Sequence, residues 1–339
     1  MTRRRLLRPT ALVVALVAAA ALLVGWTAVP AWSPADADVL ASASAKPQAD
    51  PRRKRPLYTD PTIAAAGQES RYATLALTPQ ATWYSSEHYP TEQVAGVVAD
   101  QVARASATRT TPVLVLYAIP GRDCGQYSAG GLPDAPSYRA YVRSFTRGLG
   151  KRSKALVIVE PDAIPFLAQP GCPRSAARVK MLRYAVEQIS RTGAWVYLDA
   201  GHAGWTPYDG RARLLKRAGV AKARGISTNV SNFRPLPEER AYATGLRREL
   251  ARLGVKGVRF VIDTSRNGAA SPVAGDVINP TWARIGPAPR MRFQGPLDAT
   301  LWVKHPGESD GTLNGGNGSG QWCDLLADRL LGLPESAAC

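Results

Sequence analysis

The sequence predicts an α/β fold: a single distorted β/α barrel of about seven parallel strands, with a cleft at the C-terminal strand ends. Three observations lead to this prediction. Short apolar runs rich in β-branched residues recur 31 to 42 residues apart. Helical patterns fill most of the intervals, and this alternation favours a parallel sheet. Polar residues follow the runs, at the face where barrels of this class build their active sites.

The expected strands are continuous apolar runs, too short for helices and apolar enough to be buried on both faces. They cover Val113–Ile119, Ala155–Glu160, Ala194–Leu198, Gly225–Val230, Arg259–Asp263 and Thr300–Lys304. An earlier strand is expected within Thr74–Trp83. No Gly-rich phosphate loop follows the first strand, which argues against a dinucleotide-binding sheet.

Helices are expected in three of the intervals. One begins near Thr91, a second lies before Gly193, and a third opens at Pro237 and closes at Gly254. Two other intervals lack a helical pattern: residues 266–299 contain five Pro, and residues 307–320 contain six Gly. Long irregular connections in a compact domain are usually functional loops, so both are expected beside the cleft.

The first 56 residues are expected to precede the folded domain. Residues 1–32 join a basic start to an apolar stretch, the pattern of an export signal, and Arg3–Arg5 resembles a twin-arginine motif. An uncleaved membrane anchor is the alternative, and both place residues 57–339 outside the cytoplasm. Residues 33–56, rich in Ala, Pro and Ser, are expected to be a disordered linker.

The net charge of the chain does not predict a polyanion partner. There are 43 Lys and Arg against 26 Asp and Glu, a net charge of +17, of which the first 56 residues supply +6. The +11 left on the domain comes mostly from Arg scattered along helical stretches, without interleaved aromatic residues. A solvated basic surface explains this pattern, and no nucleic-acid partner is expected.

One polar residue stands at or just past the end of six expected strands. These are Asp123, Asp162, Asp199, Asn229, Asp263 and Lys304. A single Asp after a strand is often a helix N-cap, but six such positions favour side chains that line a shared cleft.

Several carboxylates in one cleft suit acid–base hydrolysis without a cofactor. No Cys/His cluster has metal-ligand spacing, and no Gly-x-Ser-x-Gly elbow is present, so neither a metal nor a serine nucleophile is expected. Trp83 and Trp205 follow different strands. They are expected to stack on sugar rings, with core packing as the alternative.

Five sequence blocks, in order along residues 58–332, resemble glycoside hydrolase family 6, the inverting cellulases. They are Tyr117–Gly131, Val157–Asp162, Tyr197–Trp205, Thr228–Asn232 and Leu301–Gly311. The resemblance implies a distorted β/α barrel that cleaves β-1,4-glucan with inversion, and it makes residues 57–339 a catalytic domain. In such enzymes roughly 6.5–9.5 Å separates the acid from the base, which leaves room for a water.

The resemblance also implies roles for individual residues. Asp162 matches the general acid, and Asp123 matches the carboxylate that keeps this acid protonated and orders the water. Asp310 matches the residue proposed as base, and Tyr117 matches a tyrosine that presses on the distorted sugar. The positions that match sugar-binding residues are Trp83, Asp199, His202, Trp205, Asn229, Lys304 and Glu308.

The chain departs from the family pattern at one disulfide and one tryptophan. Val277 and Ile278 stand where the family has Trp and Cys, and Thr312 stands at the partner Cys. The missing Trp points to altered affinity at one subsite, or to a substrate other than plain cellulose. Cys124 and Cys172 match the family's other disulfide; Cys323 and Cys339 are left over, and pairing with each other is one option.

These expectations define a hypothesis: a secreted, monomeric endo-β-1,4-glucanase whose partner is β-1,4-glucan, with no cofactor and no metal. Ten residues separate Asp310 from Gln321, too few for a long covering loop, which favours cleavage inside the polymer. The alternatives are a cellobiohydrolase acting from chain ends and a non-catalytic glycan-binding protein of the cell envelope. A binder of anionic polymers is the weakest alternative.

Overall fold

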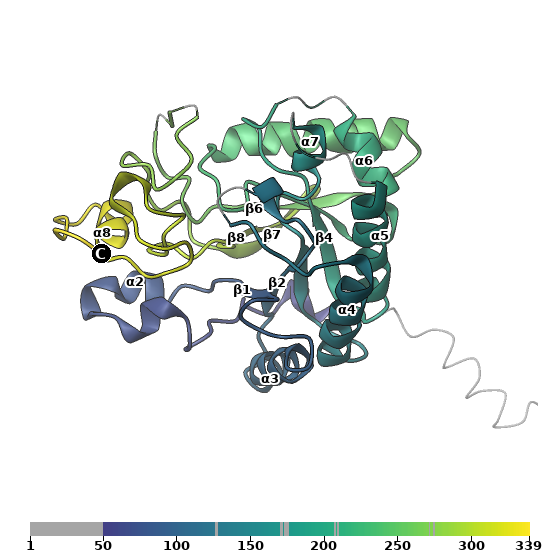
Figure 1. Ribbon diagram of the computed structural model, residues 1–339, viewed down its shortest axis with the longest axis horizontal. Helices are drawn as coiled ribbons and strands as arrows, with labels where there is room; N and C mark the ends of the chain where they lie inside the picture. Colours follow the sequence, from purple (N-terminus) through teal and green to yellow (C-terminus); the bar gives the residue numbers. More distant parts are fainter. Residues whose placement is uncertain are drawn as a thin grey trace, which may run out of the picture. The chain divides into compact units, whose positions relative to one another are not determined.

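One curled sheet organises the fold, in the strand order β1-β2-β3-β4-β5-β6-β8-β7 (Figure 1). The computed structural model describes residues 50–125, 128–169, 172, 176–206, 208, 210–270, 272–273 and 275–339. The eight strands within these residues are β1 (Thr82–Ser85), β2 (Val113–Tyr117), β3 (Leu156–Val159), β4 (Trp195–Asp199), β5 (Gly225–Thr228), β6 (Arg259–Asp263), β7 (Arg290–Gln294) and β8 (Leu297–Leu301). All neighbours pair in parallel except β7 and β8, which confirms the seven parallel strands.

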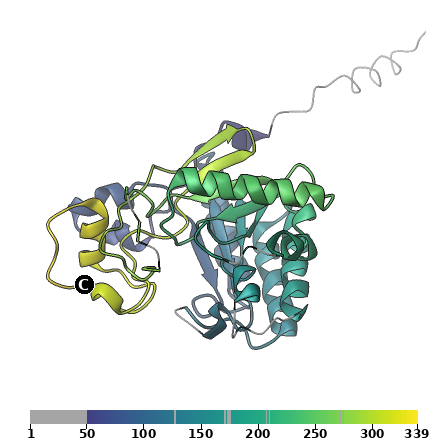
Figure 2. The same cartoon turned by 90° about the horizontal axis from the view of Figure 1, so that it is seen from above.

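Helices cover the outer face of the sheet, as Figure 2 shows from above. They are α3 (Val94–Ala107), α4 (Ala135–Leu149), α5 (Ala176–Ser190), α6 (Arg211–Arg217) and α7 (Leu236–Arg252). Successive strand residues point to opposite faces. In β2, Leu114 and Leu116 therefore join the core shared with the helices, whereas Val113, Val115 and Tyr117 join the core inside the curl.

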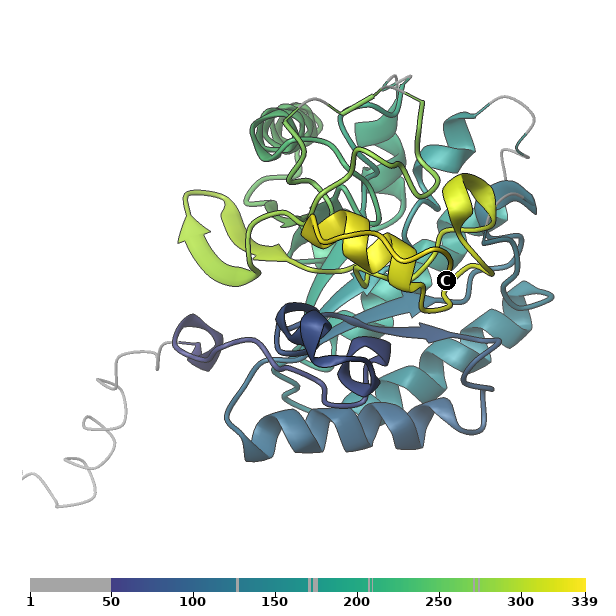
Figure 3. The same cartoon turned by 90° about the vertical axis from the view of Figure 1, so that its left-hand side faces the viewer.

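The barrel is not closed by a strand ladder, but its first and last parallel strands meet. Ala81, just before β1, donates its N–H to Trp302 O at 2.9 Å, just past β8. The Trp83 indole N–H donates to Val303 O at 2.7 Å. On this side α2 (Ala73–Ala76) and α8 (Asp324–Leu331) lie together, as Figure 3 shows, and share a small core that includes Leu75 and Ala327.

Three of the expected elements differ from the structure. Thr74–Trp83 is not one strand, because Pro79 has no N–H to donate to a neighbouring strand. Instead, α2 lies before Pro79 and β1 begins after it. The strand expected at Thr300–Lys304 runs from Leu297 to Leu301 instead. Residues 266–299 are not wholly irregular, because β7 forms a hairpin with β8.

Buried carboxylates accept the backbone N–H groups that leave the ladder at the carboxyl ends of the strands. Asp263, the last residue of β6, is 1% exposed and accepts from Ser231, Ser265, Val303 and Lys304 at 2.8–3.2 Å. Glu160, just past β3, accepts from Ala118 and Ile119, which continue β2. Because Val303 and Lys304 donate to a side chain, β8 ends at Leu301.

An arginine from before the first strand packs against the amino end of β4. Arg52 is buried, packs over the Trp195 ring at 4.2 Å, and donates to Gly193 O at 3.1 Å. Asp50–Pro56, placed in the linker by the sequence, therefore belong to the folded unit. The expected export leader and the rest of the linker lie outside the described residues. In the described part of the chain, no helix is long and apolar enough to cross a membrane.

We expect Asp263→Ala to lower the free energy of unfolding by about 3–5 kcal/mol, because it leaves buried N–H donors without an acceptor. Asp100→Ala is the matched control, since Asp100 lies on the surface of α3 in an exposed ion pair with Arg104. This control should change stability by less than about 0.5 kcal/mol. Urea denaturation measures both; equal, small effects would contradict a structural role for Asp263.

Candidate active site

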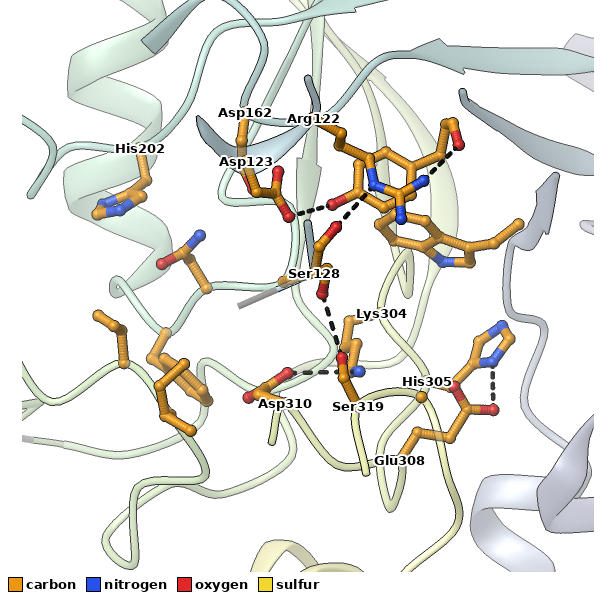
Figure 4. Close-up of a pocket in the computed structure, with 18 of the residues that line it drawn as sticks. Arg122, Asp123, Ser128, Asp162, His202, Lys304, His305, Glu308, Asp310 and Ser319 are labelled. Atoms are coloured by element: carbon orange, nitrogen blue, oxygen red, sulfur yellow. Dashed lines mark hydrogen bonds and ion pairs between the residues drawn. The ribbon is translucent and has the colours of Figure 1, made fainter. Parts of the chain in front are cut away.

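A cavity of about 1010 Å³ opens at the carboxyl ends of the strands. Nine of the eleven residues expected in catalysis or sugar binding line it, and Figure 4 shows several of them facing one another. The nine are Trp83, Tyr117, Asp123, Asp162, His202, Trp205, Lys304, Glu308 and Asp310. Of the six strand-end residues expected to line a shared cleft, Asp123, Asp162 and Lys304 line this cavity, whereas Asp199, Asn229 and Asp263 do not.

Asp199 and Asn229, expected to bind sugar, do not line the cavity. Both are fully buried. Asp199 accepts hydrogen bonds from Asp162 N and Gly201 N at 3.0 Å and from the Ser227 hydroxyl at 3.1 Å. Asn229 is tied to Asp263 O and to the Arg234 backbone. Like Asp263, both residues hold loops beneath the cleft, so their expected place in it is corrected.

Asp162 sits on a tight turn just past β3. Its φ is +67°, and Glu160 in the same turn has φ +50°. Such a conformation costs a non-glycine residue about 1–3 kcal/mol and persists only where its surroundings fix it. Here Asp199 holds the Asp162 N–H, and Asp162 lines the cavity. In the described part of the chain, Oδ1 of Asp162 has no hydrogen-bond partner.

The electrostatic surroundings of Asp162 favour its neutral form. Burial raises the pKa of Asp162 well above its ordinary value, and the charges of Asp199 and Asp123 raise it further. Burial also raises the pKa of Asp123 and Asp199, but hydrogen bonds and nearby arginines hold those increases down. The three carboxyls therefore differ: Asp162 keeps a proton most readily, as a general acid requires.

Asp123 is held toward Asp162 by an aromatic and a cation. The Tyr117 hydroxyl donates to Asp123 Oδ2 at 2.7 Å, and the Arg122 guanidinium lies 4.1 Å over the Tyr117 ring. Arg122 also donates to Ser128 O at 2.8 Å and pairs with Glu87 at 3.1 Å. Tyr117 and Asp123 thus act as one unit at the cleft floor.

Asp310 lies on the opposite side of the cavity in Figure 4, and its surroundings favour the charged form. It pairs with Arg266 at 2.6 Å and with Lys304 at 3.3 Å. Burial alone would raise the pKa of Asp310, but these two cations outweigh it and hold the pKa below its ordinary value. The cavity therefore combines one carboxyl that keeps its proton with one that loses it.

Asp310 also depends on residues that the sequence analysis did not assign. Asn279 accepts the Asp310 N–H at 2.8 Å, and its amide donates to Gly311 O at 2.6 Å and Leu313 O at 2.9 Å. Asn279 belongs to the family block that contains Val277 and Ile278, and this position could have marked it as a site residue. No sequence signal marks Arg266, since it is one arginine among many.

Aromatic side chains line the cavity on different elements. Trp83 meets Tyr117 edge-on at 5.0 Å, and Trp205 meets Phe166 edge-on at 5.0 Å. His202 Nδ1 accepts from Gly204 N at 3.1 Å. Burial, together with Arg211 and Arg234, lowers the pKa of His202 to about 3. His202 is therefore a neutral ring that carries its proton on Nε2.

Both candidate disulfides are present. Cys124 is bonded to Cys172, and Cys323 to Cys339. The first bond fixes the loop of Asp123, where Asp123 and Cys124 both have positive φ. Among the described residues, no group of three or more His, Cys, Asp or Glu side chains is arranged to hold a metal ion.

A family model described as glycosyl hydrolases family 6 matches residues 48–325. The chain belongs to this family.

Individual family 6 relatives agree with this assignment. The chain is 40% identical to endoglucanase A of Cellulomonas fimi over 283 residues, 80% of this chain and 59% of the relative. It is 38% identical to endoglucanase 1 of Streptomyces halstedii, over 76% of this chain and 80% of the relative. The chain therefore spans just under three-fifths of the Cellulomonas protein.

Among solved structures, the chain resembles the endoglucanase Cel6 of Mycobacterium tuberculosis with a TM-score of 0.75 and 36% identity. The match covers 84% of this chain and 99% of that one, which was solved in complex with methyl-cellobiosyl-4-deoxy-4-thio-β-D-cellobioside. The fold that carries this cleft is thus the distorted α/β barrel of family 6.

A partly buried ion pair between two residues that line the cavity predicts a pH-dependent stability. His305 Nδ1 lies 2.8 Å from Glu308 Oε1, and its Nε2 lies 2.5 Å from Ala81 O. Burial opposes the charged ring, but Glu308 and the Ala81 carbonyl outweigh it and raise the pKa of His305. The pair therefore stabilises the folded protein fully at pH values below the pKa of His305 in the unfolded chain. This stabilisation is lost as the pH rises through the higher pKa that His305 has in the folded protein.

We therefore expect His305→Gln to destabilise the protein more at about pH 6 than at about pH 9, because only the protonated ring pairs with Glu308. Urea denaturation of wild type and variant at the two pH values measures the difference. A loss of stability that is equal at both would show that the pair is not ionic.

Proposed function

We propose that this protein is a secreted endo-β-1,4-glucanase that hydrolyses internal bonds of cellulose-type glucans with inversion. One observation carries the proposal: Asp162, whose pKa is raised, and Asp310, which stays ionised, line the same cavity. Inverting glycosidases need such a pair, one acid for the leaving oxygen and one carboxylate on the water side. Relatives named endoglucanases, one bound to a thio-linked cellobioside, support a β-1,4-glucan substrate.

In this mechanism Asp162 protonates the glycosidic oxygen as the bond to the anomeric carbon breaks. A water attacks the opposite face of the sugar, and its proton passes toward Asp310. Arg266 and Lys304 keep Asp310 ionised, so its charge faces the cationic sugar that develops in the transition state. Tyr117 holds Asp123 beside the acid, where the Asp123 charge favours the proton on Asp162.

Internal cleavage is proposed because only ten residues separate Asp310 from Gln321, too few for a long loop over the cavity. One contact favours the alternative, a cellobiohydrolase: the hydroxyls of Ser128 and Ser319 lie 3.1 Å apart and join the two rims. A single neutral hydrogen bond contributes only about 0.5–1.5 kcal/mol, so this contact is a weak barrier to an internal segment of polymer.

A non-catalytic glycan-binding role is less well supported. A protein that only binds sugar needs neither a protonated Asp162 nor an Asp310 held in its charged form by Arg266 and Lys304. Export is proposed from the basic and apolar leader, and it agrees with two disulfides, which persist in oxidising compartments.

We expect Asp162→Ala to reduce hydrolysis of carboxymethylcellulose at least about 10³-fold, because the leaving group is then unprotonated. Asp100→Ala, remote on α3, is the matched control and should retain wild-type activity. Reducing-sugar release and solution viscosity are followed together. A rapid fall in viscosity with few new ends supports internal cleavage, whereas release of cellobiose at constant viscosity would favour the chain-end alternative. Full activity in Asp162→Ala would remove Asp162 from the acid role.

A further inference from the structure

One wall of the cavity holds an aromatic residue that the preceding roles leave unassigned. Trp282 lines the cavity and is only partly buried. Its indole N–H donates to Asp276 Oδ2 at 2.9 Å, and its ring meets the Phe233 ring edge-on at 5.6 Å and 71°. These two contacts fix the plane of the indole while part of the side chain stays accessible from the cavity.

The backbone that carries Trp282 is fixed as well. Ala283 N donates to Pro280 O at 3.1 Å, closing a turn around Trp282. The next two residues form hydrogen bonds with distant segments. Arg284 O accepts the Gly268 N–H, and the Ile285 N–H donates to Leu330 O, each at 3.0 Å. A ring held on a rigid support loses little conformational entropy when a ligand packs on it.

The same wall offers no second aromatic side chain in the segment from Gly275 to Gly286. Val277 also lines the cavity and is 37% exposed, but an aliphatic side chain has no π-face for the C–H groups of a sugar ring. Trp282, five residues further along the chain, supplies that face within the same wall.

Trp282 is linked to the catalytic side of the cavity through one aromatic neighbour. Phe233 is buried between the Trp282 ring and the Arg266 guanidinium, which lies 4.3 Å from the Phe233 ring. Arg266 in turn pairs with Asp310 at 2.6 Å. A sugar that packs on Trp282 therefore rests on the same rigid assembly that positions Asp310.

We propose that Trp282 is a specificity-determining residue that stacks on one glucose ring of a β-1,4-glucan chain in the cleft. This role rests on the proposed function and adds to it a binding position specific to longer substrates. Stacking lowers the free energy of the ground state and of the transition state alike. It therefore acts on KM and leaves kcat unchanged, and it acts only when the chain is long enough to reach Trp282.

The test compares cellohexaose with cellotriose in wild type, Trp282→Ala and Trp282→Phe. We expect Trp282→Ala to raise the KM for cellohexaose about tenfold, with the KM for cellotriose and both kcat values within about twofold. Trp282→Phe should recover most of the lost affinity, because it keeps an aromatic face without the N–H bond to Asp276. Urea midpoints check that all three proteins are folded.

The failures are distinguishable. A wild type that cannot hydrolyse cellohexaose overturns the proposed function and the stacking role that rests on it. An active wild type whose KM is unchanged in Trp282→Ala overturns the stacking role alone. A fall in kcat on both oligosaccharides, with a lower urea midpoint, would show that Trp282 only supports the packing of Phe233 and Arg266.

Discussion

The arrangement of this fold depends on where the backbone N–H groups go when parallel strands end. Beyond the last ladder bond these donors face the interior, and leaving them unpaired is costly. Buried carboxylates at the strand ends accept these N–H groups. Glu160 accepts from residues that follow β2, and Asp199 accepts from residues that follow β3 and β4. Asp263 accepts from residues that follow β5, β6 and β8. The loops that carry the cleft residues are thereby fixed to the barrel.

The same acceptors set the chemistry of the cleft. Asp199 holds the N–H of Asp162, and its charge, after burial, is the larger of the two carboxylate effects that raise the pKa of Asp162. Across the cavity Asp310 receives the opposite environment, because Arg266 and Lys304 face it. The strand-end carboxylate Asp199 thus favours the neutral form of Asp162, whereas two cations keep Asp310 ionised in the same cleft.

The sequence predicted the parallel strands β2 to β6 well, because burial on both faces leaves continuous apolar runs. It missed β7, because Arg290–Gln294 includes two Arg and none of its residues is fully buried. It extended β8 into Val303 and Lys304, whose N–H groups donate to Asp263. A polar residue at a strand end has the same sequence pattern whether it faces the cleft or holds a neighbouring loop. This pattern alone therefore could not show that Asp162 lines the cleft and Asp199 does not.

The most direct test of this account is the pH–rate profile of Asp199→Asn on a soluble cello-oligosaccharide. The amide keeps an oxygen that accepts the Asp162 N–H but removes the negative charge. We expect the alkaline limb of kcat/KM, which reports the pKa of the acid, to move toward lower pH, with KM nearly unchanged. An unmoved limb with a strongly raised KM would contradict the account, because Asp199 would then bind substrate instead of controlling the proton on Asp162.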